Sequence, residues 1–151
     1  MSEAYERGMR VRRRVLGDAH VDRVEAAKTS FEAPFQRMIT ETAWGQVWAG
    51  DTLSPRERSL ITLALLATLG QWDEFAMHVR ACANTGASQD DIREALMHVA
   101  IYAGLPAANH VFGIARLIQD GAASESSLID ENNMADEEFA QASGESRGGE
   151  K

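Results

Sequence analysis

The sequence predicts an all-α fold, and three observations predict it. Apolar residues recur with the 3.6-residue period of a helix along most of the first 120 residues. Prolines and glycines punctuate these periodic segments. No segment alternates apolar and polar residues convincingly, as a half-buried strand would. The 151 residues give room for one globular domain, which we expect to span residues 1–120.

Helix start and stop signals justify the elements in order. The basic run Arg10 to Arg14 lies within an amphipathic first segment, and we expect it to form a solvated helix face. Ser54 and Glu57 form a capping box around Pro55, which marks a helix start. Ser88 repeats the signal, and Gly86 ends the helix before it. The predicted helices are 3–16, 21–28, 31–48, 55–69, 72–84, 88–103 and 106–119.

The predicted architecture is a compact bundle of two central antiparallel helical hairpins, with the N-terminal helices packed across them. The hairpins span residues 55–84 and 88–119. In the helix 88–103, Met97 and Ile101 lie opposite the main apolar stripe. A helix that is apolar on two faces must bury both, so we expect a homo-oligomer.

The net charge of −8 is unevenly distributed. Residues 1–120 carry 13 basic and 15 acidic side chains, whereas residues 121–151 carry 2 basic and 8 acidic ones. We expect residues 121–151 to form an acidic, disordered tail. The near-neutral body argues against nucleic acid as a partner.

Membrane and secretory classes are also disfavoured. No apolar stretch approaches the ~18 residues of a membrane span, and the start MSEAYERGMR has no apolar core of a signal peptide. The single cysteine, Cys82, excludes an intrachain disulfide, so a reducing cytoplasm is the expected location.

His78 is the most informative candidate for chemistry. Gln71, Glu74 and His78 share one stripe of a helix. A carboxylate one turn from an imidazole can orient it and raise its pKa, which suits proton transfer near neutral pH. The same spacing also occurs in ordinary exposed pairs. No third ligand stands at a useful spacing, so we expect no metal site.

Other candidates have simpler structural explanations. Trp44 and Trp48 lie one turn apart, as core aromatics often do, and His110 shares a face with apolar residues. Cys82 lies among apolar residues, which favours an inert thiol. Lys28 is the one lysine outside the tail, and no nucleotide-binding motif occurs, so we expect no cofactor.

Two segments carry a resemblance to a known family. The longer segment resembles the carboxymuconolactone decarboxylase family, which is part of a wider group of helical proteins similar to alkyl hydroperoxidase D. Its sequence is WGQVWAGDTLSPRERSLITLALLATLGQWDEFAMHVRACANTGASQDDIREALMHVAIYAGLPAANHVF. VRRRVLGDAHVDRVEAA resembles the decarboxylases that give the family its name. In the hydroperoxidase relatives a Glu, a Cys-x-x-Cys pair and a His carry the chemistry. Glu57 and His78 match the outer positions, but Gln71 and Glu74 replace the cysteines, which argues against thiol peroxidase activity.

The resemblance implies a cofactor-independent carboxy-lyase of the β-ketoadipate pathway. Its small-molecule substrate would be a carboxylated lactone that loses carbon dioxide to give β-ketoadipate enol-lactone. Under this resemblance we assign His78 as the proton donor with Glu74 orienting it. Arg58 or Arg80 would bind carboxylate, and Trp44, Tyr102 and His110 would wall or polarise the pocket. The family also implies rings, often hexamers.

Two other classes of function stay open at this point. Another small-molecule enzyme of the same fold would keep the pocket and change its carboxylate-binding residues. A non-catalytic helical interaction protein would use its tail to bind and would have an inert pair of hairpins.

Overall fold

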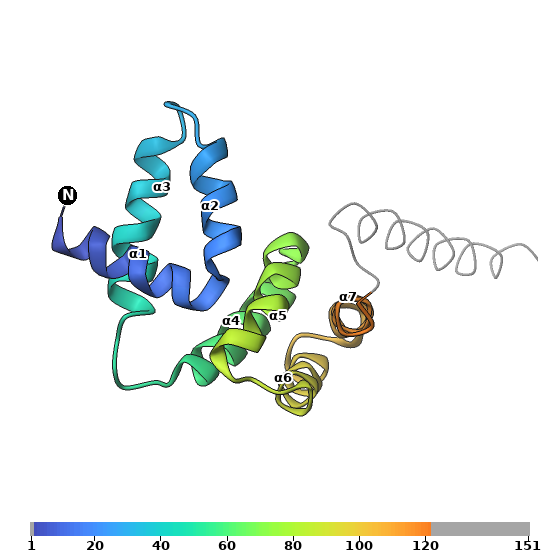
Figure 1. Ribbon diagram of the computed structural model, residues 1–151. Helices are drawn as coiled ribbons and strands as arrows, with labels where there is room; N and C mark the ends of the chain where they lie inside the picture. The colour runs from blue at the N-terminus through green and yellow to red at the C-terminus, as the bar shows by residue number, and fades with distance from the viewer. Residues whose placement is uncertain (1, 122–151) are drawn as a thin grey trace, which may run out of the picture.

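The computed structural model describes residues 2–121, and its regular elements there are all helices (Figure 1). The all-α prediction is confirmed. The expected acidic tail lies, apart from Gly121, outside the described residues. The elements are α1 (Glu3–Leu16), α2 (Asp18–Ala27), α3 (Ala33–Ile39), the π-helix η1 (Thr40–Val47), α4 (Pro55–Leu69), α5 (Trp72–Thr85), α6 (Gln89–Tyr102) and α7 (Leu105–Gln119).

The predicted helix ends rest on the expected local chemistry. The Ser54 hydroxyl accepts a hydrogen bond from the Glu57 backbone N–H, and the Glu57 carboxylate accepts one from the Ser54 N–H. Ser88 and Asp91 form the equivalent capping box at α6. Glu57 therefore has a structural role that explains its position fully.

The predicted helix 31–48 is not one regular α-helix. α3 ends at Ile39, and the chain continues through η1, where the Trp48 N–H donates to the Ala43 carbonyl at 2.8 Å. A close crossing with α1 accompanies this change. A Cβ on Gly8 would lie 2.0 Å from the Thr40 carbonyl oxygen, and one on Gly45 would lie 2.4 Å from the Ala4 carbonyl oxygen. Periodicity of side chains gives no sign of a backbone contact of this kind.

Two groups of helices meet at α5, an N-terminal group of α1, α2, α3 and η1 and a C-terminal group of α4 to α7 (Figure 1). α4 packs on α5 and α6, while α7 packs on α6 and α5. Their shared core centres on the fully buried side chains of Leu63, Phe75, Leu96 and Val111. In the N-terminal group, α1 packs on η1 and also on α5, around a second cluster that includes Val15, Trp44 and Ala81. α5 is thus the helix that both groups cover.

The basic run of α1 does not form a uniformly solvated face, and that expectation is wrong for Arg12. Its side chain is buried, forms an ion pair with Glu25 at 3.3 Å and donates to Gln36 at 3.3 Å. Arg10 and Arg14 are exposed, as expected. Arg12 joins three helices, because a buried guanidinium needs several partners to offset its lost hydration.

Apolar side chains remain exposed on the C-terminal group. Met97 and Ile101 of α6 are 51% and 76% exposed, on the second apolar face that the sequence indicated. Ile61, Leu65 and Leu69 form a matching exposed stripe on α4. Within residues 2–121, no helix is both long enough and apolar enough to span a membrane.

Candidate functional site

His78 lies at the junction between α5 and the N-terminal helices. The side chain is buried, and its ring stacks on Trp48 with centroids 5.7 Å apart and planes inclined by 16°. The ring of Trp44 lies 6.3 Å from His78 and 5.3 Å from Trp48. The π-helical segment presents both indoles to α5, since Trp44 lies within η1 and Trp48 directly follows it. Two expected site residues, His78 and Trp44, are therefore neighbours.

The environment of His78 favours a neutral imidazole. Burial lowers its pKa from 6.5 to about 4, and the nearby charge of His20 lowers it further within that shift. The buried Nδ1 has no hydrogen-bond partner among the described residues. Nδ1 therefore has hydrogen-bonding capacity that no described residue uses.

Glu74 does not raise the pKa of His78, as had been expected. The predicted rise in the pKa of His78 is wrong, since the pKa is lowered and Glu74 is not among the causes. Glu74 is exposed, and no hydrogen bond or ion pair joins it to His78 in the described part of the chain. Sharing a helical stripe brought the two Cα positions near each other, but the imidazole turns into the interior. The orienting role of Glu74 remains a prediction.

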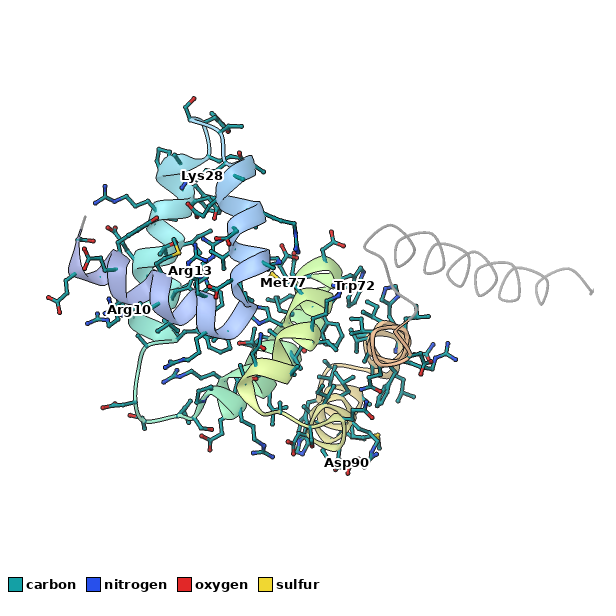
Figure 2. The ribbon with its side chains drawn as sticks, in the orientation of Figure 1. Arg10, Arg13, Lys28, Trp72, Met77 and Asp90 are labelled. Atoms are coloured by element: carbon teal, nitrogen blue, oxygen red, sulfur yellow. The ribbon has the colours of Figure 1, made fainter. Side chains whose placement is uncertain are left out.

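A cavity of about 400 Å³ lies between α5 and the helices α1 and α2, and the rings of His78, Trp44 and Trp48 are not part of its lining. Its volume falls in the range of about 300 to 1,000 Å³ that is typical of small-molecule sites. Figure 2 shows Met77, one lining residue, on the side of α5 that faces α2. The lining residues are Leu16, Ala19, His20, Arg23, Met77, Arg80 and Ala81.

The cavity is cationic rather than acidic. Arg80, one of the two expected carboxylate-binding residues, contributes a guanidinium whose Nη2 atom is buried and has no hydrogen-bond partner. Arg23 and His20 line the same space from α2. No carboxylate is among the lining residues. This composition suits an anionic ligand, since an unpaired guanidinium in a partly enclosed site favours a carboxylate partner.

Three expected site residues lie elsewhere. The Arg58 guanidinium lies beside Gly50, where an added Cβ would come within 2.7 Å of its Nη2 atom. The His110 ring lies 4.3 Å from the ring of Trp72, and Figure 2 shows Trp72 on the side of α5 away from the cavity-lining Met77. Tyr102 is 84% exposed and stacks on His98. None of the three lines the cavity, and their expected roles remain predictions.

Sequence reasoning missed His20 and Arg23 as candidates. Both lie in α2, which was expected to begin at residue 21 and so to leave His20 outside the helix. Only the position of α2 across the cavity from α5 makes them part of a site. Trp48 was visible as the i+4 partner of Trp44, but the spacing gave no sign that the imidazole of His78 would lie against it.

The thiol of Cys82 is unsuited to nucleophilic chemistry. It is buried, and this burial raises its pKa to about 11. The S–H donates to the His78 carbonyl oxygen at 3.3 Å. Among residues 2–121, no three or more His, Cys, Asp or Glu side chains gather in a way that could hold a metal ion.

Similarity to known proteins covers most of the chain. Residues 33–117 match the model of the carboxymuconolactone decarboxylase family. The chain is 44% identical over 107 residues to the 4-carboxymuconolactone decarboxylase of Acinetobacter baylyi, covering 71% of this chain and 80% of that protein. It is 40% identical over 102 residues to the nitrosuccinic acid decarboxylase of Metarhizium robertsii, covering 68% of this chain and 71% of that protein. A 4-carboxymuconolactone decarboxylase from Pseudomonas putida is 54% identical over 43 residues, which are 28% of this chain and 90% of that sequence.

Proposed function

The chain belongs to the carboxymuconolactone decarboxylase family, and we propose that it converts 4-carboxymuconolactone into β-ketoadipate enol-lactone in the breakdown of protocatechuate. One observation carries the proposal at the level of geometry. A cavity of about 400 Å³ is lined by Arg23, Arg80 and His20 with no acidic residue, and His20 lies close enough to the buried imidazole of His78 for its charge to lower the pKa of that ring. Such a site suits a small acid that must bind, lose charge and gain a proton.

The chemistry of the substrate explains why these side chains suffice. When the C–CO₂ bond breaks, its electron pair delocalises through the conjugated double bond onto the lactone carbonyl oxygen. Carbon dioxide leaves, and a proton added to ring carbon completes the product. The substrate thus provides its own electron sink, so the protein must supply binding, a dry environment and an acid.

The two carboxylates of the substrate need different surroundings. A cation against the leaving carboxylate would stabilise the reactant more than the transition state, because this group loses its charge as the bond breaks. The retained carboxylate keeps its charge throughout. The arginine side of the cavity therefore suits the retained group, and the apolar lining residues Leu16, Met77 and Ala81 suit the leaving group.

His78 is our proposed proton donor. Its imidazole is neutral in the free protein at neutral pH, because burial lowers its pKa to about 4. Two substrate carboxylates arriving nearby favour the charged imidazolium, so binding itself raises the proton affinity of His78. The ring takes up this proton from water when the substrate binds and then transfers it to the dienolate carbon. Glu74 would have at most a secondary, positioning part, since no bond links it to the imidazole.

A second substrate is favoured by one specific observation, the 40% identity to a nitrosuccinic acid decarboxylase. Nitrosuccinate is also a dicarboxylate, and its nitro group accepts the electron pair that decarboxylation leaves behind. Both substrates thus ask for the same features, namely a cationic site for one carboxylate and no external electron sink. They differ in shape and in the position of the group that accepts the electrons.

The experiment is decarboxylation by the purified full chain after exhaustive chelation and dialysis. Carbon dioxide release is followed with each of the two substrates in parallel. We expect rapid release from 4-carboxymuconolactone and slow release from nitrosuccinate. No release from the lactone would overturn the proposal, and preferential turnover of nitrosuccinate would assign the second substrate instead. Activity that returned only with an added metal would overturn the cofactor-independent mechanism.

We also propose that the chain forms a homo-oligomer. The exposed stripe of α4 and the second apolar face of α6 support this, since a second copy would remove both from water. Sedimentation velocity tests it, with a monomer at micromolar concentration as the contradicting result.

The single buried thiol suits a reducing compartment such as the cytoplasm.

A further inference from the structure

The cavity has a second wall that lies outside the matched family region. The family model covers residues 33–117, which include α5 and its Arg80. Leu16, Ala19, His20 and Arg23 precede that region and close the cavity from the side of α1 and α2. The site is therefore composite: one wall belongs to the shared family core, and the other belongs to an N-terminal segment.

The acidic residues of α2 are all engaged by cations other than Arg23. Asp18 and Asp22 accept hydrogen bonds from Arg13 at 3.0 and 2.8 Å. Glu25 pairs with Arg12 at 3.3 Å and with Lys28 at 2.5 Å. Arg23 has no carboxylate partner in the described part of the chain, although three carboxylates lie on its own helix.

Arg80 shows the same lack of a partner from the opposite wall. Its Nη2 atom is buried without a hydrogen bond. Arg23, which is exposed, and Arg80 line the same cavity, so an anion bound there would meet positive charge from both α2 and α5. This charge pattern suits an anionic ligand, because no acidic residue lines the cavity and the acids of α2 are paired with other cations.

We propose that Arg23 and Arg80 together bind the retained carboxylate of the substrate, so that α2 sets the preference of this chain for dicarboxylic acids. The proposal rests on the proposed function and extends it to specificity. Arg80 provides a carboxylate site from the family core, and Arg23 provides the second cation from the N-terminal segment. A relative with another residue at the position of Arg23 would accept acids that lack the second carboxylate.

This role has a definite kinetic signature. The retained carboxylate keeps its charge from the bound substrate to the transition state, so Arg23 stabilises both about equally. Removing such a contact raises KM and leaves kcat nearly unchanged. A residue that bound the leaving carboxylate, or one that gave the proton, would change kcat instead.

The test compares Arg23→Gln with Arg10→Gln, each of which removes one positive charge. Arg10 is exposed on the part of α1 far from Met77 (Figure 2) and does not line the cavity. The substrates are the dicarboxylic lactone and its ester at the retained carboxylate. We expect Arg23→Gln to raise KM for the diacid by roughly 10- to 100-fold, as for loss of a charged hydrogen bond. Its KM for the ester should change little, and Arg10→Gln should behave as wild type on both.

A binding measurement separates this proposal from the proposed function. The saturated lactone diacid lacks the conjugated double bond, so it binds without reacting, and calorimetry gives its Kd. We expect Arg23→Gln to weaken this binding by the same roughly 10- to 100-fold. If the chain released no carbon dioxide but showed this loss, the function would fail and the dicarboxylate site would stand. An Arg23→Gln variant with wild-type KM and wild-type Kd would overturn the site, whatever the activity.

Discussion

The rings of Trp48 and His78 stack with centroids 5.7 Å apart and planes inclined by 16°. The contact joins the end of the π-helical segment to the middle of α5, so it links the two groups of helices through a titratable side chain. Burial and the charge of His20 lower the pKa of the imidazole and keep it neutral, and stacking fixes its orientation. The stability of the fold and the state of the proposed acid are therefore coupled.

The first prediction concerns stability against pH. The folded-state pKa of His78 is about 4, below the ordinary 6.5. Between these values the unfolded chain binds a proton that the folded chain does not. The free energy of unfolding must then rise with pH through this window. The contribution of His78 to stability is lost as pH falls from about 6.5 towards 4. Urea unfolding should show a loss of about 2 kcal/mol from pH 7.5 to pH 5 that His78→Gln removes.

His98→Gln is the control for this measurement. It removes an exposed imidazole and should keep the wild-type pH dependence. The comparison stays above pH 5, because carboxylates such as Glu57, whose pKa is lowered by hydrogen bonds from Ser54, lose stabilising interactions at lower pH. Equal slopes for wild type and His78→Gln would show that His78 is not held neutral in the fold.

A second prediction follows from the thiol. Cys82→Ala should fold, lose about 1 kcal/mol of stability and keep its turnover, because the buried group is small and its pKa is raised to about 11 by burial. Iodoacetamide should modify the folded protein far more slowly than the unfolded chain. A loss of turnover beyond about a hundredfold, with the fold intact, would mean that the thiol takes part in the chemistry.

The third prediction tests the crossing of α1 with η1. Gly8→Ala would place a methyl group 2.0 Å from the Thr40 carbonyl oxygen, so the two helices must separate. We expect a loss of more than about 3 kcal/mol in the free energy of unfolding and a fall in turnover, because η1 carries Trp44 to His78.

Gly113→Ala is the matched substitution for the third prediction. Nothing lies within 4 Å of a Cβ at Gly113, which is inside α7. Alanine there should stabilise the protein by about 0.5 to 1 kcal/mol, since glycine is unfavourable in a helix interior. If Gly8→Ala were as stable as wild type, the close crossing would not constrain the N-terminal group.

Much of the helix layout could be predicted because its signals are local. Ser54 and Glu57 mark a start whatever the rest of the chain does, and Gly86 marks an end because its φ of 84° is easy for glycine alone. The π-helical segment could not be predicted in this way. It accompanies a backbone contact between Gly8 and Thr40, which lie 32 positions apart in the sequence.

The site could be predicted only in part for the same reason. Spacing along one helix placed Glu74 beside His78, but the tertiary structure buries the imidazole and leaves the carboxylate exposed. Arg80 was recognised by residue type alone, without any knowledge of which helix it would face. Arg23 joins it only because the tertiary structure places α2 across the cavity from α5, and no pattern within a single helix carries that information.

His78 as the proton donor is the central proposal, and turnover of His78→Gln tests it directly. The variant, checked for fold by circular dichroism and for assembly by sedimentation, should lose roughly 10² to 10⁴ in kcat, as for a positioned acid. Glu74→Gln should cost less, since no bond joins Glu74 to the imidazole. Wild-type kcat should fall as pH rises through the pKa of His78 in the substrate complex, and the residual rate of His78→Gln should lack this step. Near-wild-type turnover by folded His78→Gln would contradict the account and move the search for the acid to His20, His110 or Tyr102.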